Sequence, residues 1–176
     1  MNIKRKSSIL FAWLVRSITF FMPDIPIFMR LRGFLYGFLM NKSGINFQVA
    51  HSAILNSISS LSVGNNVYIA NNCTLFCGGG VIIGNNVIIA PNVVVSSNNH
   101  SFDNLTGYRF GKADFSPVNI NKNSWICANV TITGGSTVPS YCIVGPGSTF
   151  IKSSGYRRNA LYSGVPAKVI KELEGL

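Results

Sequence analysis

Two histidines are the residues of this chain best suited to act as a general base, and one of them has an unusual setting. A lone histidine is more often structural than catalytic, and His51 gives no reason to think otherwise. His100, in contrast, stands at the start of a polar segment, residues 97–117, that interrupts a regular apolar pattern. Long loops on a rigid scaffold are commonly functional. A neutral imidazole, with an ordinary pKa of about 6.5, can accept a proton from a hydroxyl group. His100 is therefore the candidate base.

The segments on both sides of this loop follow a six-residue period. The apolar positions of the period are Val63, Ile69, Leu75, Ile83, Ile89, Val95, Ile120, Ile126, Ile132, Val138, Val144 and Phe150. A small or branched residue often follows four places later, at Val67, Cys73, Val87, Val93, Ser124, Val130, Ser136, Cys142 and Ser148. This period is typical of short strands wound into a solenoid, with three six-residue units in each triangular coil. We predict an all-β solenoid in which both sets of side chains point inward, with asparagine-rich turns at its corners.

Three stretches of the chain resemble a known family. They are residues 81–100, residues 117–150 and residues 163–172. They are similar to the hexapeptide-repeat acyltransferases, and most similar to the branch with galactoside and maltose acetyltransferases and polysaccharide O-acetyltransferases. The resemblance covers residues 61–174. It implies a left-handed parallel β-helix and a homotrimer with active sites between subunits.

Composition and resemblance together divide the chain into three parts. Residues 1–44 are expected to form a basic, aromatic and helical extension. Residues 45–153 are expected to form the left-handed β-helix, with the loop at 97–117 ejected from it. Residues 154–176 are expected to form a C-terminal tail and helix.

The four cysteines favour no metal site and no disulfide framework. Their spacing does not match paired metal ligands. Cys73 and Cys142 occupy inward positions of the period, where a thiol acts as a small apolar group. Unpaired cysteines are usual in a reducing cytoplasm, which is the compartment we expect. A zinc carbonic anhydrase on this type of solenoid needs three histidine ligands, and the chain has two.

The resemblance implies that His100 is the base of an acetyl-CoA-dependent O-acetyltransferase. It follows the stretch from Ala90 to Val93, as the family's catalytic histidine follows the same type of unit. The base would take the proton of a sugar hydroxyl as its oxygen attacks the thioester, in a direct-transfer ternary complex. Such catalysis contributes about 10²–10⁴-fold in rate. Asp103 is a candidate to orient the ring, with a backbone carbonyl as the alternative.

An acceptor-binding asparagine and an acidic residue precede the histidine in many members of the family. Asn71 or Asn72 could serve as the asparagine here. Gly78 stands at the acidic position, and this departure argues against simple galactoside or maltose acceptors.

The resemblance also implies an acetyl-CoA site in the C-terminal coils. The residues implied for this site are Trp125, Ala128, Pro146, Ile151, Lys152, Pro166, Lys168 and Lys171. The lysines would bind phosphate as point charges. Cys127 replaces the family's usual glycine, and an extra segment contains Arg157 and Arg158, which either reach CoA phosphate or face water.

The charge of the chain favours anionic partners. The formal net charge is +10, and residues 1–42 contain seven basic residues and one acid, Asp24. The apolar run from Ile9 to Met22 is shorter than the ~20 residues that span a bilayer. Residues 1–40 therefore contact the inner face of the cytoplasmic membrane as a peripheral segment, cap the open end of the solenoid, or do both. The basic residues do not form a nucleic-acid-binding module, so no nucleic acid partner is predicted.

The preferred hypothesis is O-acetylation of a sugar in a surface polysaccharide precursor, such as O-antigen or capsule. One alternative is an N-acetyltransferase for a nucleotide-linked amino sugar, in which the same histidine would deprotonate an ammonium group. The other is a non-enzymatic solenoid scaffold, which would bind no CoA.

Overall fold

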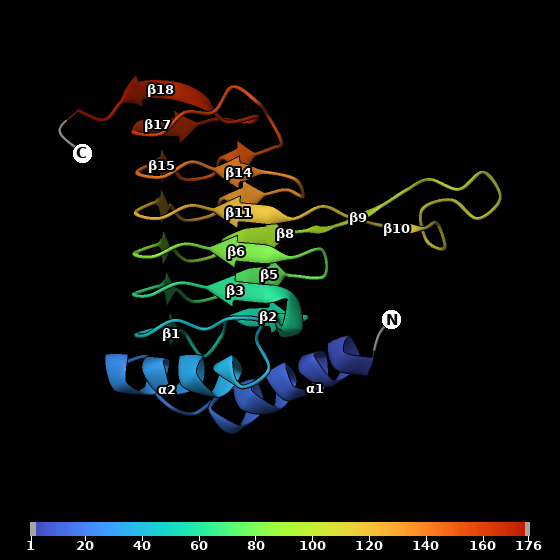
Figure 1. The fold of residues 1–176 in the computed structure, drawn as a ribbon, viewed down its shortest axis with the longest axis vertical. Helices are drawn as coiled ribbons and strands as arrows, with labels where there is room; N and C mark the ends of the chain where they lie inside the picture. The colour runs from blue at the N-terminus through green and yellow to red at the C-terminus, as the bar shows by residue number, and fades with distance from the viewer. Residues whose placement is uncertain (1–2, 175–176) are drawn as a thin grey trace.

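A solenoid of short strands stands on two helices in the computed structural model, which describes residues 3–174 (Figure 1). The helices α1 (Ile3–Ile18) and α2 (Pro26–Gly37) lie across one end of the stack. A two-stranded ribbon projects from its side at mid-height. The parallel solenoid predicted from the six-residue period is thus confirmed, and both helices lie in the predicted extension.

The described residues form three parallel sheets that run the length of the stack. The first sheet contains β1 (Gln48–Val49), β4 (Tyr68–Ile69), β7 (Ile88–Ile89), β12 (Trp125–Ile126), β15 (Ile143–Val144) and β17 (Ala160–Ser163). The second sheet contains β3 (Leu61–Val63), β6 (Val81–Ile83), β11 (Val118–Ile120) and β14 (Thr137–Val138). The third sheet contains β2 (Ile54–Asn56), β5 (Thr74–Phe76), β8 (Val94–Ser96), β13 (Thr131–Ile132) and β16 (Thr149–Phe150).

The coils below the projecting ribbon are two residues longer than those above it. Gln48 pairs with Tyr68, a spacing of 20 residues, whereas Trp125 pairs with Ile143, a spacing of 18. The extra residues lie where the chain leaves the third sheet, in the 3-10 helix η1 (Ile58–Ser60) and in the turn at residues 77–80. These longer corners lie beneath the point where the ribbon leaves the solenoid.

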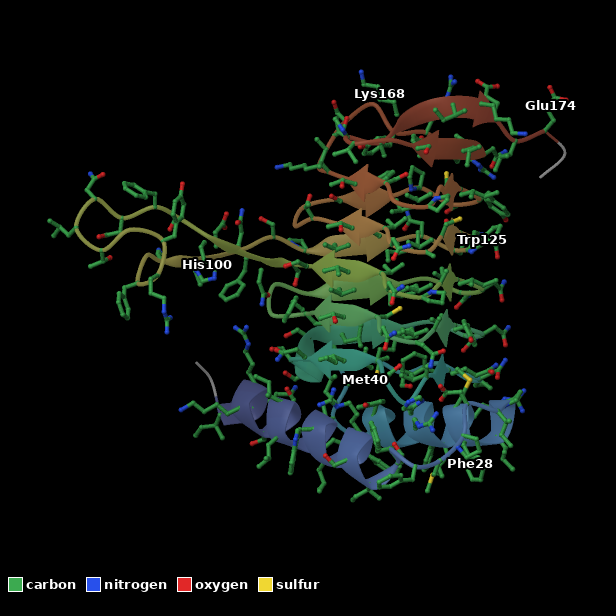
Figure 2. The ribbon with its side chains drawn as sticks, turned by 180° about the vertical axis from the view of Figure 1, so that it is seen from behind. Phe28, Met40, His100, Trp125, Lys168 and Glu174 are labelled. Atoms are coloured by element: carbon green, nitrogen blue, oxygen red, sulfur yellow. The ribbon has the colours of Figure 1, made fainter. Side chains whose placement is uncertain are left out.

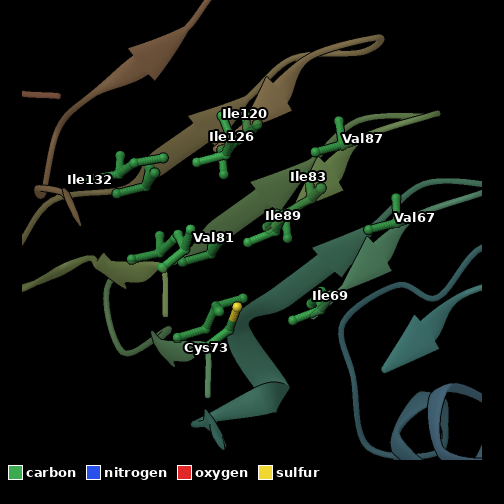
Figure 3. Packing of buried hydrophobic residues seen from close by; sticks show 14 of the residues in the cluster. Val67, Ile69, Cys73, Val81, Ile83, Val87, Ile89, Ile120, Ile126 and Ile132 are labelled. Carbon is green, nitrogen blue, oxygen red and sulfur yellow. The ribbon is translucent and has the colours of Figure 1, made fainter. Parts of the chain in front are cut away.

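The interior of the solenoid is built from the residues that the period predicts to point inward. All twelve apolar positions and all nine small or branched positions named above are buried. Figure 3 shows some of them packed together, among them Ile69, Ile89 and Ile126. Fully burying one such aliphatic side chain contributes about 1.5–3 kcal/mol. Burial also raises the pKa of the Cys73 and Cys142 thiols, which keeps them neutral, as expected for small apolar groups.

Asparagines form a ladder along one corner of the stack. Asn46, Asn66, Asn86 and Asn123 have φ values of 56° to 58°, a conformation that asparagine tolerates better than most residues. Their side-chain amides donate in sequence to the next coil, over distances of 3.0, 3.1 and 2.8 Å. The predicted asparagine-rich turns are therefore confirmed at this corner.

The helical extension covers the lower end of the solenoid with the buried side of each helix. Pro26 begins α2, where its missing N–H costs no hydrogen bond. A Cβ atom on Gly33 would collide with the backbone of Phe47, so this glycine permits close approach of α2 to the first coil. Tyr36 of α2 joins the core, and burial raises its pKa to about 12.

The predicted C-terminal helix is wrong. Residues Lys168–Glu172 form strand β18, which pairs antiparallel with β17, and Tyr162 faces Val169. Without this strand, β17 would leave unpaired backbone groups at the upper end of the first sheet. The β-branched residues Val169 and Ile170 also favour an extended backbone.

Candidate functional site

The residues that interrupt the period form an arm, defined here as residues 97–117. Its strands β9 (Asn98–His100) and β10 (Ala113–Phe115) pair antiparallel. Ser97 anchors its root, because the Ser97 hydroxyl donates to the Phe76 carbonyl at 2.8 Å and accepts from the Gly79 N–H at 2.9 Å. The solenoid therefore presents His100 on a ribbon that extends away from its own core.

His100 lies on the arm with its side chain exposed (Figure 2). It pairs with Ala113 across the ribbon, and its backbone N–H donates to the Asn99 side chain at 3.0 Å. Within residues 3–174, no hydrogen bond involves the imidazole ring itself. The ring is therefore available to an incoming group or to the surface of a neighbouring molecule.

Asp103 does not orient His100 within this chain. Its Oδ1 atom accepts from the N–H groups of Leu105 and Thr106, at 3.0 and 2.9 Å, and from the Thr106 hydroxyl at 2.9 Å. These hydrogen bonds, chiefly those from Thr106, lower the pKa of Asp103. The carboxylate thus closes the turn at the tip of the arm through Oδ1, and among the described residues it forms no hydrogen bond with His100.

Asn71 takes part in a polar cluster around Asp24. One Asp24 oxygen accepts from Asn71 at 2.7 Å and lies 2.7 Å from the His51 ring nitrogen Nδ1. The other accepts from the His51 N–H at 2.8 Å and from Arg32 at 2.7 Å. Burial alone raises the pKa of Asp24, but the hydrogen bonds from His51 and Asn71 outweigh it and hold the pKa below its usual value. The cluster ties the helix connection to the first two coils.

Asn72, the other candidate for acceptor binding, lies on an edge where the first and third sheets meet. It has a φ of 58°, an exposed side chain, and an N–H that donates to the Ser52 hydroxyl at 3.0 Å. Ala128 and Pro146 lie on the same edge, which we call the turn edge. Backbone hydrogen bonds of 3.0 to 3.1 Å join its successive turns.

The remaining residues implied for CoA lie elsewhere on the molecule. Ile151 and Lys152 follow β16 on the corner from which the arm leaves, which we call the arm edge. Ile151, Pro166 and Lys168 line one groove of about 290 Å³ at the upper end. Lys171 is exposed on β18. Trp125 is half exposed on the first sheet, and Figure 2 shows it on the side of the stack opposite the arm.

The structure therefore distributes the implied CoA residues over the turn edge, the arm edge, the first sheet and the upper end of one chain. The third sheet separates the turn edge from the arm edge. The strand-and-turn segment between them, residues 93–97, has a length of about 13 Å at 3.3 Å per residue. No single surface of one chain brings His100 together with Ala128 and Pro146.

The sequence did not reveal the position of Arg5. The Arg5 guanidinium lies 4.9 Å from the ring centroid of Phe115 on the arm, and its Nε donates to the Ser57 hydroxyl at 3.0 Å. It occupies the space that a side chain on residue 78 would need. The buried Asn98 side-chain oxygen faces the same place and has no hydrogen-bond partner among the described residues. A cation thus lies where the resembled family often has an acid.

The two arginines of the extra segment contact other residues of the chain. Arg157 forms an exposed ion pair with Glu172 at 2.9 Å. Arg158 lies over the Tyr141 ring, 5.1 Å from its centroid. Neither points into the groove at the upper end.

Comparisons with known proteins agree with the fold. No family model matches the chain. The Staphylococcus aureus (strain MRSA252) protein SAR2635, whose name describes an acetyltransferase, is 33% identical over 115 residues, or 65% of this chain. The matched part spans only 56% of the length of that relative.

Solved structures match nearly the whole chain. A galactoside acetyltransferase in complex with coenzyme A is 28% identical, with a TM-score of 0.83 over 99% of this chain and 84% of its own. A Vibrio cholerae hexapeptide-repeat acetyltransferase, VCA0836, in complex with acetyl coenzyme A is 19% identical, with a TM-score of 0.82 over 99% and 91%. AntD, an N-acyltransferase of Bacillus cereus in complex with dTDP and coenzyme A, is 21% identical, with a TM-score of 0.58 over 77% and 85%.

These matches define the fold. It is that of the left-handed β-helix acetyltransferases, and two of the neighbours were solved with coenzyme A or acetyl coenzyme A bound to them. Among residues 3–174, no group of three potential metal-binding side chains is present.

Proposed function

We propose that this protein is an acetyl-CoA-dependent O-acetyltransferase that modifies a sugar hydroxyl, with His100 as the general base. The observation that carries the proposal is the position of His100. It is an imidazole with no hydrogen-bond partner among residues 3–174, exposed on an arm that leaves the solenoid. A histidine with a structural role would be expected to have a hydrogen-bond partner or a buried ring.

The separation of the two edges supports a homotrimer with active sites between subunits. His100 and Lys152 belong to the arm edge, whereas Ala128 and Pro146 belong to the turn edge. If the arm edge of one subunit faces the turn edge of the next, both sets line one cleft. The acetyl group and the base would then come from opposite walls of that cleft.

The proposed reaction is a direct transfer in a ternary complex. The His100 imidazole takes the hydroxyl proton while the sugar oxygen attacks the thioester carbonyl of acetyl-CoA. The C–S bond then breaks, and the departing CoA sulfur receives the proton from the imidazolium. Lys152, Lys168 and Lys171 hold the CoA phosphates. General-base help contributes about 10²–10⁴-fold, and positioning of the two substrates supplies much of the rest.

The arm root favours a sugar that carries negative charge nearby. The Arg5 guanidinium offers a cation at this root. A diphosphate-linked precursor of a surface polysaccharide, such as O-antigen or capsule, carries negative charge that suits this cation. We place the protein in the cytoplasm, peripherally at the inner face of the cytoplasmic membrane, where such a precursor can be lipid-linked.

The similarity to AntD supports a second candidate, N-acetylation of a nucleotide-linked amino sugar. The same histidine would deprotonate an ammonium group in that reaction. Paired acceptors that differ only in a hydroxyl or an amino group at one carbon distinguish the two candidates.

The test combines binding and turnover in one variant. His100→Ala should bind acetyl-CoA in calorimetry as the unmodified protein does, but release CoA thiol at least ~100-fold more slowly with an acceptor present. Asn104→Ala, an exposed change on the same arm, should leave turnover unaltered. Turnover of His100→Ala within threefold of normal would remove His100 as the base. Absence of acetyl-CoA binding at millimolar concentration would instead favour the non-enzymatic scaffold.

A further inference from the structure

The outward faces of both helices are apolar. In α1, Leu10, Leu14 and Ile18 recur every four residues and are exposed. Ile27, Leu31 and Phe34 of α2, and Phe38 directly after its end, follow the spacing of a single helix face and are exposed as well. We call these seven residues the base stripes. The opposite sides of the same helices are buried against the solenoid, so the base stripes lie on the outer surface of the molecule.

This pattern is the reverse of what a simple cap requires. The terminal unit of a solenoid normally carries a polar outer face, because that face contacts water. Here the outer face contains long aliphatic and aromatic side chains, and Phe34 is 65% exposed. An exposed apolar face of this kind marks an interaction site.

The charges around the base stripes are almost all positive. Lys6, Arg30 and Lys42 are exposed, and Arg16 is partly exposed. Asp24 is the only acidic residue among residues 3–44, and Arg32 and His51 already pair with it. The base therefore presents apolar side chains surrounded by cations.

A groove at this end has the same character. It has a volume of about 620 Å³, lies between α2 and the first coil, and is lined by Arg30, Phe34, Phe38 and Lys42 among others. Phe34 and Phe38 form an edge-to-face aromatic pair along it, with ring centroids 5.1 Å apart. Such a groove can hold an acyl chain between its aromatic rings while Arg30 and Lys42 meet an anionic headgroup.

We propose that the base stripes are a docking surface for an anionic lipid bilayer, with α1 and α2 lying in the membrane interface. Aliphatic and aromatic side chains enter the boundary between headgroups and acyl chains, and the surrounding cations face anionic lipid. A second copy of the same base is the poorer occupant, because it would bring like charges together. No helix among residues 3–174 is long and apolar enough to cross a bilayer, so the contact is made along the helix faces.

This orientation has a consequence for the proposed reaction. Figure 1 shows both helices lying across the stack, so the coils rise away from the membrane and the arm extends sideways above it. His100 would then be held at a set height above the headgroups. This consequence depends on the proposed function, whereas the docking surface itself does not.

The test is co-sedimentation of the full chain with vesicles of phosphatidylcholine, with and without phosphatidylglycerol. The unmodified protein should bind the anionic vesicles, and added salt should weaken binding. Phe34→Ser/Phe38→Ser and Leu10→Ser/Leu14→Ser should each lower the partition coefficient at least ~10-fold. Lys6→Gln and Arg30→Gln should each lower it about fivefold on anionic vesicles only.

Ile170→Ser is the matched control, because Ile170 is 61% exposed at the opposite end of the solenoid. It should bind vesicles as the unmodified protein does. Trp13 provides a second measurement: in Trp125→Phe protein, where Trp13 is the remaining tryptophan, its emission should shift to shorter wavelength on vesicle binding.

The proposal is overturned if the unmodified protein stays in the supernatant or if the base-stripe variants sediment normally. It is also overturned if the base stripes mediate dimerisation without vesicles and the same variants abolish that dimer. Calorimetry with acetyl-CoA in the absence of vesicles tests the proposed function separately, so failure of one idea leaves the other standing.

Discussion

Replacing Asp24 with asparagine removes the carboxylate that faces the buried guanidinium of Arg32. The Arg32 side chain is only 1% exposed, and its Nη1 atom lies 2.7 Å from Asp24. The same carboxylate also accepts hydrogen bonds from His51 and Asn71. In the Asp24→Asn variant, an amide group without charge faces all of these donors.

The expected loss of stability is large because the buried Arg32 guanidinium is left without its counter-charge. Breaking a buried ion pair by removing one partner costs about 3–5 kcal/mol. The Asp24 side chain is 20% exposed, so water can partly replace the lost interaction. We therefore expect a loss near the low end, about 3 kcal/mol in the free energy of unfolding.

Urea unfolding followed by circular dichroism measures this loss of stability. Limited trypsin digestion shows which part of the chain is destabilised. Units of a solenoid contact only their neighbours. Trypsin should therefore cleave the extension that contains α1 and α2 before it cleaves the upper coils. Arg30→Gln is the control on the same helix. Its exposed hydrogen bond to Asn46 should be worth less than about 1 kcal/mol. A loss below about 1 kcal/mol for Asp24→Asn would refute the role assigned to the cluster.

The pH dependence of unfolding gives the same reasoning a second test. The pKa of Asp24 is lowered in the folded protein, so its contribution to stability is present above the ordinary value of 3.8. That contribution is lost as the pH falls through the folded pKa. The difference in stability between the unmodified protein and Asp24→Asn should therefore shrink on acidification below about pH 4. A difference that stays constant would contradict the assignment.

Three further predictions concern the corners and the site. Gly84→Ala should lower the free energy of unfolding in urea by about 1–3 kcal/mol, because the alanine Cβ would lie 2.6 Å from the Lys122 backbone nitrogen. An unchanged urea midpoint would contradict this prediction. Lys168→Ala/Lys171→Ala should weaken binding of CoA more than of dephospho-CoA in calorimetry, and equal losses would exclude contact with the 3′-phosphate. Arg5→Gln should raise KM for a diphosphate-linked acceptor with little change in kcat, whereas an equal effect on an uncharged acceptor would argue against charge recognition.

The sequence alone predicted the solenoid and its core, for a direct physical reason. In a coil built from repeated short strands, the position of a residue within the six-residue period decides whether it faces inward. Ile89 and Val93 follow that rule, and so does Ser136, a polar residue whose hydroxyl donates to the Phe150 carbonyl at 3.2 Å. The break in the period likewise located the arm and placed His100 on it.

The C-terminal segment shows where local pattern was insufficient. Lys168–Glu172 was expected to be helical, but the open edge of β17 supplies hydrogen-bond partners that only a strand can use. The pairing of Asp103 with His100 is not found among the described residues either, and it stays a prediction. Closeness in sequence suggested pairing with His100, but a turn gave the carboxylate nearer donors.

The sequence by itself determined which residues form the coils and which one leads the arm, because a period reports directly on the direction of each side chain. Only the tertiary structure decided the contacts between distant segments. Asp24 meets Asn71 across 47 positions, and Arg5 meets Ser57 across 52. No periodic pattern encodes such pairs, since they depend on how the two helices pack against the lowest coils. The apolar outer face of those helices became evident for the same reason, once their buried sides were known.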